Sequence, residues 1–267
     1  MRILGSILRR IITSRYYYLG TLFSMLSYLS AHVERSDEEP SEISIFGVAA
    51  FILFLASLFC GALLVYQNRA RFVTKDGVSR TSFCRAIALF YAKIFLLLVA
   101  ATLPFVIPYQ WLDSDQADTW TLGFRIVEVG AALTFLLMTV AVAVVVHNGA
   151  AALVVARGHS RHCIRDSLRA FRTIWRQIFF TVALTFVPSL IAAPFRIFSS
   201  YIPLADWLTT GMEFAFLPYQ FALANAAFLF FAKSLRDQAP GLAGLPEPVA
   251  PNNIYGFPLS QPKTREA

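Results

Sequence analysis

The chain has 267 residues, of which 57% are hydrophobic and only 15% charged, and its mean hydropathy is +0.59. Soluble domains carry about 25% charged residues. A soluble protein could not cover this much apolar surface, so the composition predicts an integral membrane protein. The net charge of +7 would suggest nucleic acid in a soluble protein. Here the basic residues lie between apolar spans, which points to a membrane surface and away from a nucleic-acid partner.

Six apolar spans predict an all-α polytopic protein with about six transmembrane helices. A helix needs about 20 apolar residues to cross about 30 Å of hydrocarbon. The second, fourth and sixth spans reach this length alone, and the others need residues from the amphipathic segment before them. The first span is the weakest because it is short and rich in Tyr and Ser, and a cleaved signal peptide is its alternative interpretation. The spans are 16–31, 45–66, 94–109, 124–146, 178–197 and 212–232.

Basic and acidic segments alternate between these spans. Arginine and lysine precede the first span and fill the segments after the second and fourth, whereas Asp and Glu follow the first and third spans. Because basic residues stay on the cytoplasmic side, we predict a multi-pass protein of a bacterial-type inner (cytoplasmic) membrane with both termini in the cytoplasm. The proline-rich segment 236–267 lacks apolar periodicity and is predicted to be a disordered cytoplasmic tail.

An internal repeat relates the middle of the chain to its later part. The stretch 91–107 aligns without a gap on 175–191, so that Ile94 falls on Ile178 and Pro104 on Pro188. Both stretches follow a basic amphipathic segment and a long apolar span. We predict three units, 1–66, 78–146 and 160–232, each with a basic interfacial helix, a membrane helix, an acidic outer loop and a second membrane helix.

The third basic helix, 160–176, has apolar residues recurring at i, i+4, i+7 and i+11 beside a stripe of arginines. The earlier units offer shorter apolar stripes of the same kind. Each such helix is expected to lie in the cytoplasmic interface with its apolar face against acyl chains. Its arginines would then engage anionic lipid or a cytoplasmic protein partner, or serve only for anchoring and topology. The apolar sets are Ile164, Leu168, Phe171 and Trp175; Phe83, Ile87 and Phe90; and Ile3, Ile7 and Ile11; the arginines are Arg161, Arg165, Arg169, Arg172 and Arg176.

Polar residues within membrane spans are costly and mark candidate functional positions. Arg125 and Glu128 are three residues apart and are predicted to pair at the outer end of the fourth span. Glu213, Gln220 and Asn225 form a polar path along the sixth span that could line a cavity. In the alternative interpretation the carboxylates reach the outer interface and the amides hydrogen-bond between helices. His147 and Asn148 are expected to close the fourth span on its inner side, and the prolines within spans are expected to shape packing.

Catalytic machinery is not indicated by any motif in the sequence. There is no nucleotide-binding glycine loop, serine elbow or zinc-protease helix. The cluster of His159, His162 and Cys163 lacks the further placed ligands that a metal requires. We therefore expect a protein that is not an enzyme, with no catalytic residue, cofactor or metal.

The stretch 164–191 contains Ser167, Leu168, Ala170, Phe171 and Arg172 at the end of a basic helix that runs into an apolar one. It resembles a repeat in the membrane domain attached to some glycerophosphodiester phosphodiesterases and in its stand-alone bacterial relatives. The phosphodiesterase catalytic domain is absent, so no active-site residue carries over. The resemblance implies an integral inner-membrane protein. The expected function is a scaffold or accessory role with a basic inner face, and the alternative is a transporter or permease subunit for a small or lipid-like solute.

Overall fold

A computed structural model describes residues 2–36, 45–74, 77–112, 130, 132–135, 137–199 and 203–244. Every regular element within these residues is helical, which confirms the all-α class. Five helices in this part of the chain are long and apolar enough to cross a bilayer: Ile45–Phe72, Arg80–Ala101, Ala132–Arg157, Cys163–Pro194 and Leu208–Gln238. Many of their large apolar side chains are exposed, as lipid contact requires. The chain is a multi-pass membrane protein.

Each predicted span that the structure describes lies within a longer helix. The first span forms α2 (Arg15–Ser36), which is long enough to cross the membrane but is not among the five, because Tyr and Ser dilute its apolar character. The third and fifth spans obtain their extra residues from the basic segment before them, which lies in the same helix. The first span does not, because the basic segment before it forms a separate helix that ends at Ile12, and α2 instead extends to Ser36. The other long helices are α3 (Ile45–Phe72), α4 (Arg80–Leu112), α7 (Cys163–Ser199) and α8 (Pro203–Gln238).

The fourth span differs from its prediction at its inner end. Its beginning, with Arg125 and Glu128, lies outside the described residues. The helical segment continues past residue 146 through a π-helical turn, η2 (Ala141–His147), into α6 (Asn148–Arg157). His147 and Asn148 therefore do not close the span. Every residue from 149 to 156 is buried, because α6 is the central helix at this end of the bundle and packs against α7 and α8.

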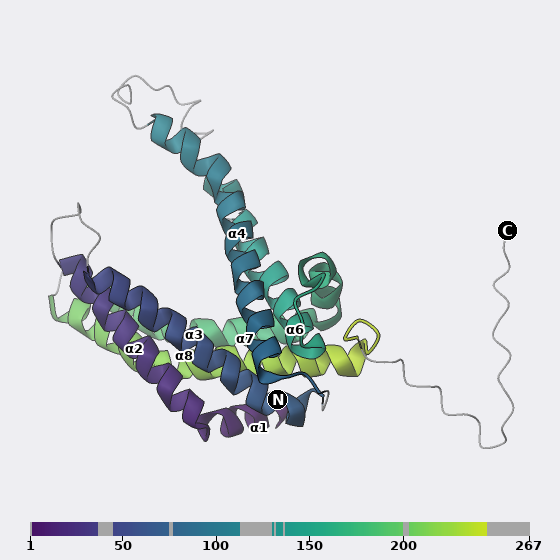
Figure 1. Ribbon diagram of the computed structural model, residues 1–267. Helices are drawn as coiled ribbons and strands as arrows, with labels where there is room; N and C mark the ends of the chain where they lie inside the picture. The colour runs from purple at the N-terminus through teal and green to yellow at the C-terminus, as the bar shows by residue number, and fades with distance from the viewer. Residues whose placement is uncertain are drawn as a thin grey trace, which may run out of the picture.

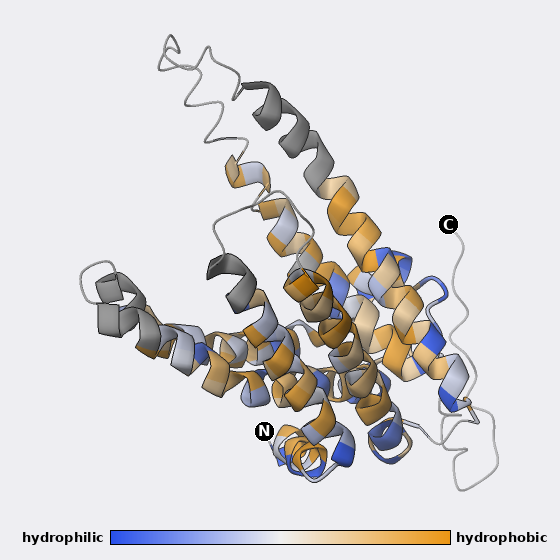
Figure 2. Ribbon diagram, turned by 60° about the vertical axis from the view of Figure 1, so that its left-hand side comes forward, coloured by the Kyte–Doolittle hydropathy of each residue, from blue (hydrophilic) through white to orange (hydrophobic). Residues whose placement is uncertain are grey.

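The helices form a bundle from which α4 rises at a steep angle. In Figure 1, α2, α3 and α8 run side by side, and α1 (Arg2–Ile12) lies across their lower end. α7 packs along α8. Hydrophilic residues gather mainly at the end of the bundle near α1, while the long helices are largely apolar (Figure 2). This polarity is the one expected of helices that leave a membrane at that end.

Two of the three predicted lipid-facing stripes are buried in protein. Phe83, Ile87 and Phe90 belong to the hydrophobic core, as do Ile7 and Ile11 of α1, although Ile3 is exposed. The prediction that these faces lie against acyl chains was wrong. An apolar stripe needs only a nonpolar neighbour, and here α6 and α8 supply one in place of lipid.

The burial pattern supports a repeat in a different register from the predicted one. The order of buried, half-buried and exposed side chains along 81–97 recurs at every position along 161–177, an offset of 161 − 81 = 80 residues. This register places Arg85 on Arg165 and Ile94 on Ile174. The sequence alignment had placed Ile94 on Ile178, four residues further on. Because four residues make slightly more than one helical turn, both registers turn the same face inward.

Candidate functional site

The exposed face of the first half of α7 combines arginines with large apolar side chains. Leu168, Trp175 and Phe179 are 50%, 46% and 53% exposed, and the arginine side chains beside them are exposed as well. The opposite face packs into the core through small or apolar residues such as Ala170 and Ile174. We call this surface the α7 basic face: Arg161, Arg165, Leu168, Arg169, Phe171, Arg172, Trp175, Arg176 and Phe179.

Aromatic contacts organise the α7 basic face. The ring centroid of Phe179 lies 6.0 Å from that of Trp175 and 6.2 Å from that of Phe171, both edge to face. The guanidinium of Arg176 lies over the Trp175 ring at 5.5 Å. Tryptophan and arginine arranged in this way suit the interface between headgroups and acyl chains, where one part is apolar and the other wet.

Backbone geometry separates the basic half of α7 from its apolar half. Ile174 has φ −118° and ψ 23°, outside the helical region, so that α7 consists of two helical segments joined at a kink. The amphipathic segment before the kink and the membrane segment after it can therefore point in different directions.

Most of the arginine charge on this face is not neutralised by the protein. Within the described residues, Arg165 alone among the five predicted arginines has a carboxylate partner, Asp166, with a 3.5 Å N–O distance. Asp166 is held more closely by Arg157, at 3.0 Å. The remaining cations are available to phosphate groups or to an acidic protein surface.

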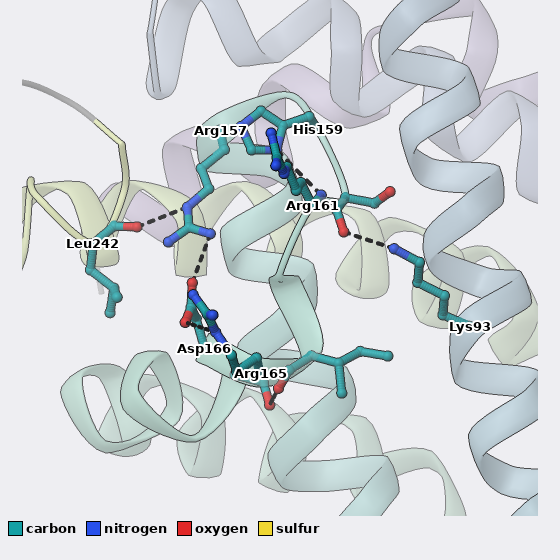
Figure 3. Close-up of polar contacts among 10 residues, drawn as sticks. Lys93, Arg157, His159, Arg161, Arg165, Asp166 and Leu242 are labelled. Atoms are coloured by element: carbon teal, nitrogen blue, oxygen red, sulfur yellow. Dashed lines mark hydrogen bonds and ion pairs between the residues drawn. The ribbon is translucent and has the colours of Figure 1, made fainter.

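Arg157 and Lys93 connect the loop between α6 and α7 to its neighbours (Figure 3). The Nε of Arg157 donates to the carbonyl of Leu242 at 3.0 Å, which attaches the segment after α8. Lys93 of α4 donates to the carbonyl of Ser160 at 3.0 Å. These two cations thus position the start of α7 from both sides.

Arg69, near the end of α3, caps the end of α6. Its Nε and Nη2 donate to the carbonyls of Val155 and Ala156 at 2.5 and 2.9 Å, and its side chain is buried. Gly158, in the left-handed region with φ 75°, donates to the Val154 carbonyl at 2.8 Å. Carbonyls in the last turn of a helix lack intrahelical partners, and a cation there complements the helix dipole.

The histidines and cysteine of the predicted cluster take part in the same loop. His159 Nδ1 accepts from the backbone N–H of Arg161 at 3.3 Å. Burial, together with the charges of Arg157, Arg161 and His162, lowers the pKa of His159. Cys163 is buried in the core. No group of three His, Cys, Asp or Glu side chains within the described residues is arranged to hold a metal ion.

Two adjoining cavities lie along one face of α8. The first, of about 160 Å³, lies between α2, α3, α4 and α8 and is lined by Gln220 and Asn225. The second, of about 270 Å³, lies between α2, α7 and α8 and is lined by Glu213 and Gln220. Gln220 and Leu217 line both. The structure therefore places all three polar residues of the predicted path beside cavities.

The polar groups at these cavities include residues that sequence reasoning missed. The Tyr28 hydroxyl donates to Oε2 of Glu213 at 3.0 Å. Tyr91 lines the first cavity and Ser189 the second. Tyr28 lies in the weakest predicted span, and its abundant tyrosines and serines were the available signal. Asn225 is buried and donates to the carbonyl of Phe221 within its own helix at 2.8 Å.

Pro188 lies in the wall of the second cavity and interrupts the hydrogen bonds of α7. A proline has no N–H to donate to the carbonyl four residues earlier, which here belongs to Leu184. The hydroxyl of Tyr219, on α8, donates to that carbonyl at 3.1 Å. The proline is thus accommodated by packing between α7 and α8.

Comparisons with protein-family models, with curated proteins and with solved structures found no match to this chain.

Proposed function

We propose that the protein is a non-enzymatic scaffold or accessory component of a bacterial-type cytoplasmic membrane, whose α7 basic face engages anionic lipid. The observation that carries the proposal is the exposure of Trp175 and Phe179 beside arginines that the protein leaves largely unneutralised. The aromatic side chains insert at the acyl boundary while the guanidinium groups reach the phosphates.

The strength of this engagement can be estimated from the charges. Each arginine near an anionic surface contributes about 1 kcal/mol, so three contribute about 3 kcal/mol. Since about 1.4 kcal/mol corresponds to a tenfold change in affinity, removing three should weaken binding of anionic lipid about 100-fold. The contribution should fall as salt screens the surface, because the side chains are exposed.

The test is native mass spectrometry of the protein extracted in mild detergent, comparing retention of phosphatidylglycerol with that of phosphatidylcholine. The variant replaces Arg165, Arg169 and Arg172 with Gln. The control removes the same charge from exposed arginines elsewhere on the basic end, by replacing Arg9, Arg10 and Arg71 with Gln. We expect phosphatidylglycerol to be lost from the α7 variant only. Equal loss from both variants, or full retention by the α7 variant, refutes specific engagement by this face.

The proposed orientation places both termini and the α7 basic face in the cytoplasm. In a background without native cysteines, single cysteines at Glu38 and Asp115 should react with an impermeant thiol reagent in intact cells. A cysteine at Arg161 should react only after the cells are opened. Labelling of the cysteine at position 161 in intact cells would show that the orientation is opposite to the proposed one.

A second candidate function is transport of a small or lipid-like solute, which the two adjoining cavities along α8 favour. Transport predicts that neither Glu213→Gln nor Asn225→Leu complements a deletion of the gene, although the protein level stays normal. The scaffold function predicts mild effects of both changes. Full complementation by both variants would therefore remove this candidate.

A further inference from the structure

A cleft of about 350 Å³ lies between α1 and the end of α3, at the hydrophilic end of the bundle (Figure 2). Small-molecule pockets measure roughly 300–1,000 Å³, so the cleft has room for a small ligand. The lining residues from α1 and the turn after it occur at i, i+3, i+4 and i+7, which places them on one helical face. The opposite face of α1 packs into the core. The cleft is lined by Ser6, Arg9, Arg10, Thr13, Arg71 and Phe72.

Arg71 lines the cleft because of its position on α3. Residues two apart lie on nearly opposite sides of a helix. The arginine two positions earlier, Arg69, points inward, where it is buried and caps α6. Arg71 is instead exposed and borders the cleft beside α1. The packing of α1 on α3 thus gathers guanidinium groups from two helices that are far apart in the sequence.

The charge of the cleft is positive and is not balanced by the protein. No acidic side chain lines it among the described residues. In the same part of the chain, neither an ion pair nor a hydrogen bond engages the guanidinium group of Arg9, Arg10 or Arg71. Like charges that share a site repel one another, and an anion placed among them offsets this repulsion. The cleft therefore favours an anionic ligand.

The donors of the cleft fit phosphate better than carboxylate. A carboxylate has a single charge and two oxygens, which one bidentate guanidinium can satisfy. A phosphate monoester has a charge of about −1.5 to −2 and three acceptor oxygens, and a diphosphate has more of each. The three guanidinium groups and the hydroxyl of Ser6 supply donors in that number. A phosphodiester such as that of phosphatidylglycerol is singly charged and would use only part of them.

We propose that this cleft binds a phosphate group with about two or more negative charges, as in a phosphate monoester or a diphosphate. The group belongs either to a water-soluble compound or to the headgroup of a lipid such as phosphatidic acid. The inference is independent of the α7 basic face, because no residue of that face lines the cleft. The triple α7 variant should keep this ligand. Its control variant, which lacks all three arginines of the cleft, should lose the ligand while retaining phosphatidylglycerol.

The experiment uses the full chain in nanodiscs of phosphatidylcholine, which has no net charge, at low ionic strength. Inorganic pyrophosphate is titrated as the free probe by calorimetry, and malonate is the competitor, a doubly charged anion without phosphate. In a second arm, nanodiscs containing equal amounts of phosphatidic acid and phosphatidylglycerol are analysed by native mass spectrometry for retained lipid. The variants are Arg10→Gln and Arg71→Gln, one from each helix. The control is Arg2→Gln, which removes an exposed guanidinium of α1 that does not line the cleft.

Saturable pyrophosphate binding that is about tenfold weaker in each cleft variant and unchanged in Arg2→Gln identifies a site for a soluble phosphate compound, since one charge-assisted hydrogen bond contributes about that factor. Preferential retention of phosphatidic acid that is lost in both cleft variants, without pyrophosphate binding, identifies a headgroup site. Absence of both, equal competition by malonate, or equal weakening by Arg2→Gln overturns the proposal. The arginines are exposed, so the variants should fold. Should one fail to fold, malonate competition and the other cleft variant decide the question.

Discussion

Replacing Arg69 with Met should destabilise the protein more than any other single arginine change in the part of the chain that the structure describes. The Arg69 side chain is only 3% exposed, and it donates to two carbonyls at the end of α6. Its guanidinium also lies 5.7 Å from the centroid of the Phe83 ring, so that it joins α3, α4 and α6. Methionine keeps much of the apolar stem but removes every donor.

The magnitude follows from the hydrogen bonds that are lost. A hydrogen bond from a charged donor contributes about 1.5–3 kcal/mol to stability. The Met variant loses two such bonds and leaves both carbonyls without this donor, so that the full contribution of each bond is lost. The favourable charge at the helix C-terminus adds about 0.3–1 kcal/mol. The two bonds and the terminal charge together should therefore lower the free energy of unfolding by about 3–7 kcal/mol. Arg69→Lys keeps the charge but lacks the planar guanidinium whose two N–H groups reach both carbonyls, so its destabilisation should be intermediate.

The assay is unfolding by increasing mole fractions of sodium dodecyl sulfate in mixed micelles, followed by tryptophan fluorescence. Arg71→Met is the matched control, because Arg71 lies on the same helix but is exposed. We expect the control to lie within about 0.5 kcal/mol of the wild type. If Arg69→Met unfolds at the same point as Arg71→Met, then capping of α6 by Arg69 does not stabilise the fold and the reasoning is wrong.

Two further predictions concern helix packing and use the same unfolding assay. Tyr219→Phe should cost about 1 kcal/mol by leaving the Leu184 carbonyl without its donor; in a Pro188→Ala background, which restores a backbone donor, the cost should nearly vanish, and an undiminished cost would contradict the proline account. Gly149→Ala should cost about 1–3 kcal/mol because a Cβ there would collide with the Ser167 carbonyl oxygen. Gly5→Ala, which enters open space on α1, should stabilise by up to about 1 kcal/mol, and equal effects of the two alanines would contradict the packing assignment.

The long helices could be predicted from the sequence because each depends on local composition. Apolar spans of sufficient length must satisfy their backbone groups internally, and only a helix does so within one segment. The span 178–197 therefore had to lie in a helix whatever it packs against, and α7 contains it. The same argument was weakest for α2, where Tyr and Ser lower the hydropathy while leaving helix formation intact.

What each helical face contacts could not be predicted locally. Phe83 and Phe171 both lie on apolar stripes of basic segments, yet Phe83 is buried in protein while Phe171 is partly exposed. Periodicity identifies an apolar face but does not say whether lipid or another helix covers it. For the same reason the stretch after His147, which contains several alanines, gave no sign that it forms the most buried helix.

The sequence by itself determined the membrane class, the positions of the long helices and the polar residues that lie within the apolar spans, because each depends on side chains close together in the chain. Only the tertiary structure decided that Tyr28 donates a hydrogen bond to Glu213, that Arg69 caps α6 and that Tyr219 donates to the Leu184 carbonyl. These partners are 185, 86 and 35 residues apart along the chain. Contacts at such separations are set by how helices pack against one another, which no local pattern encodes.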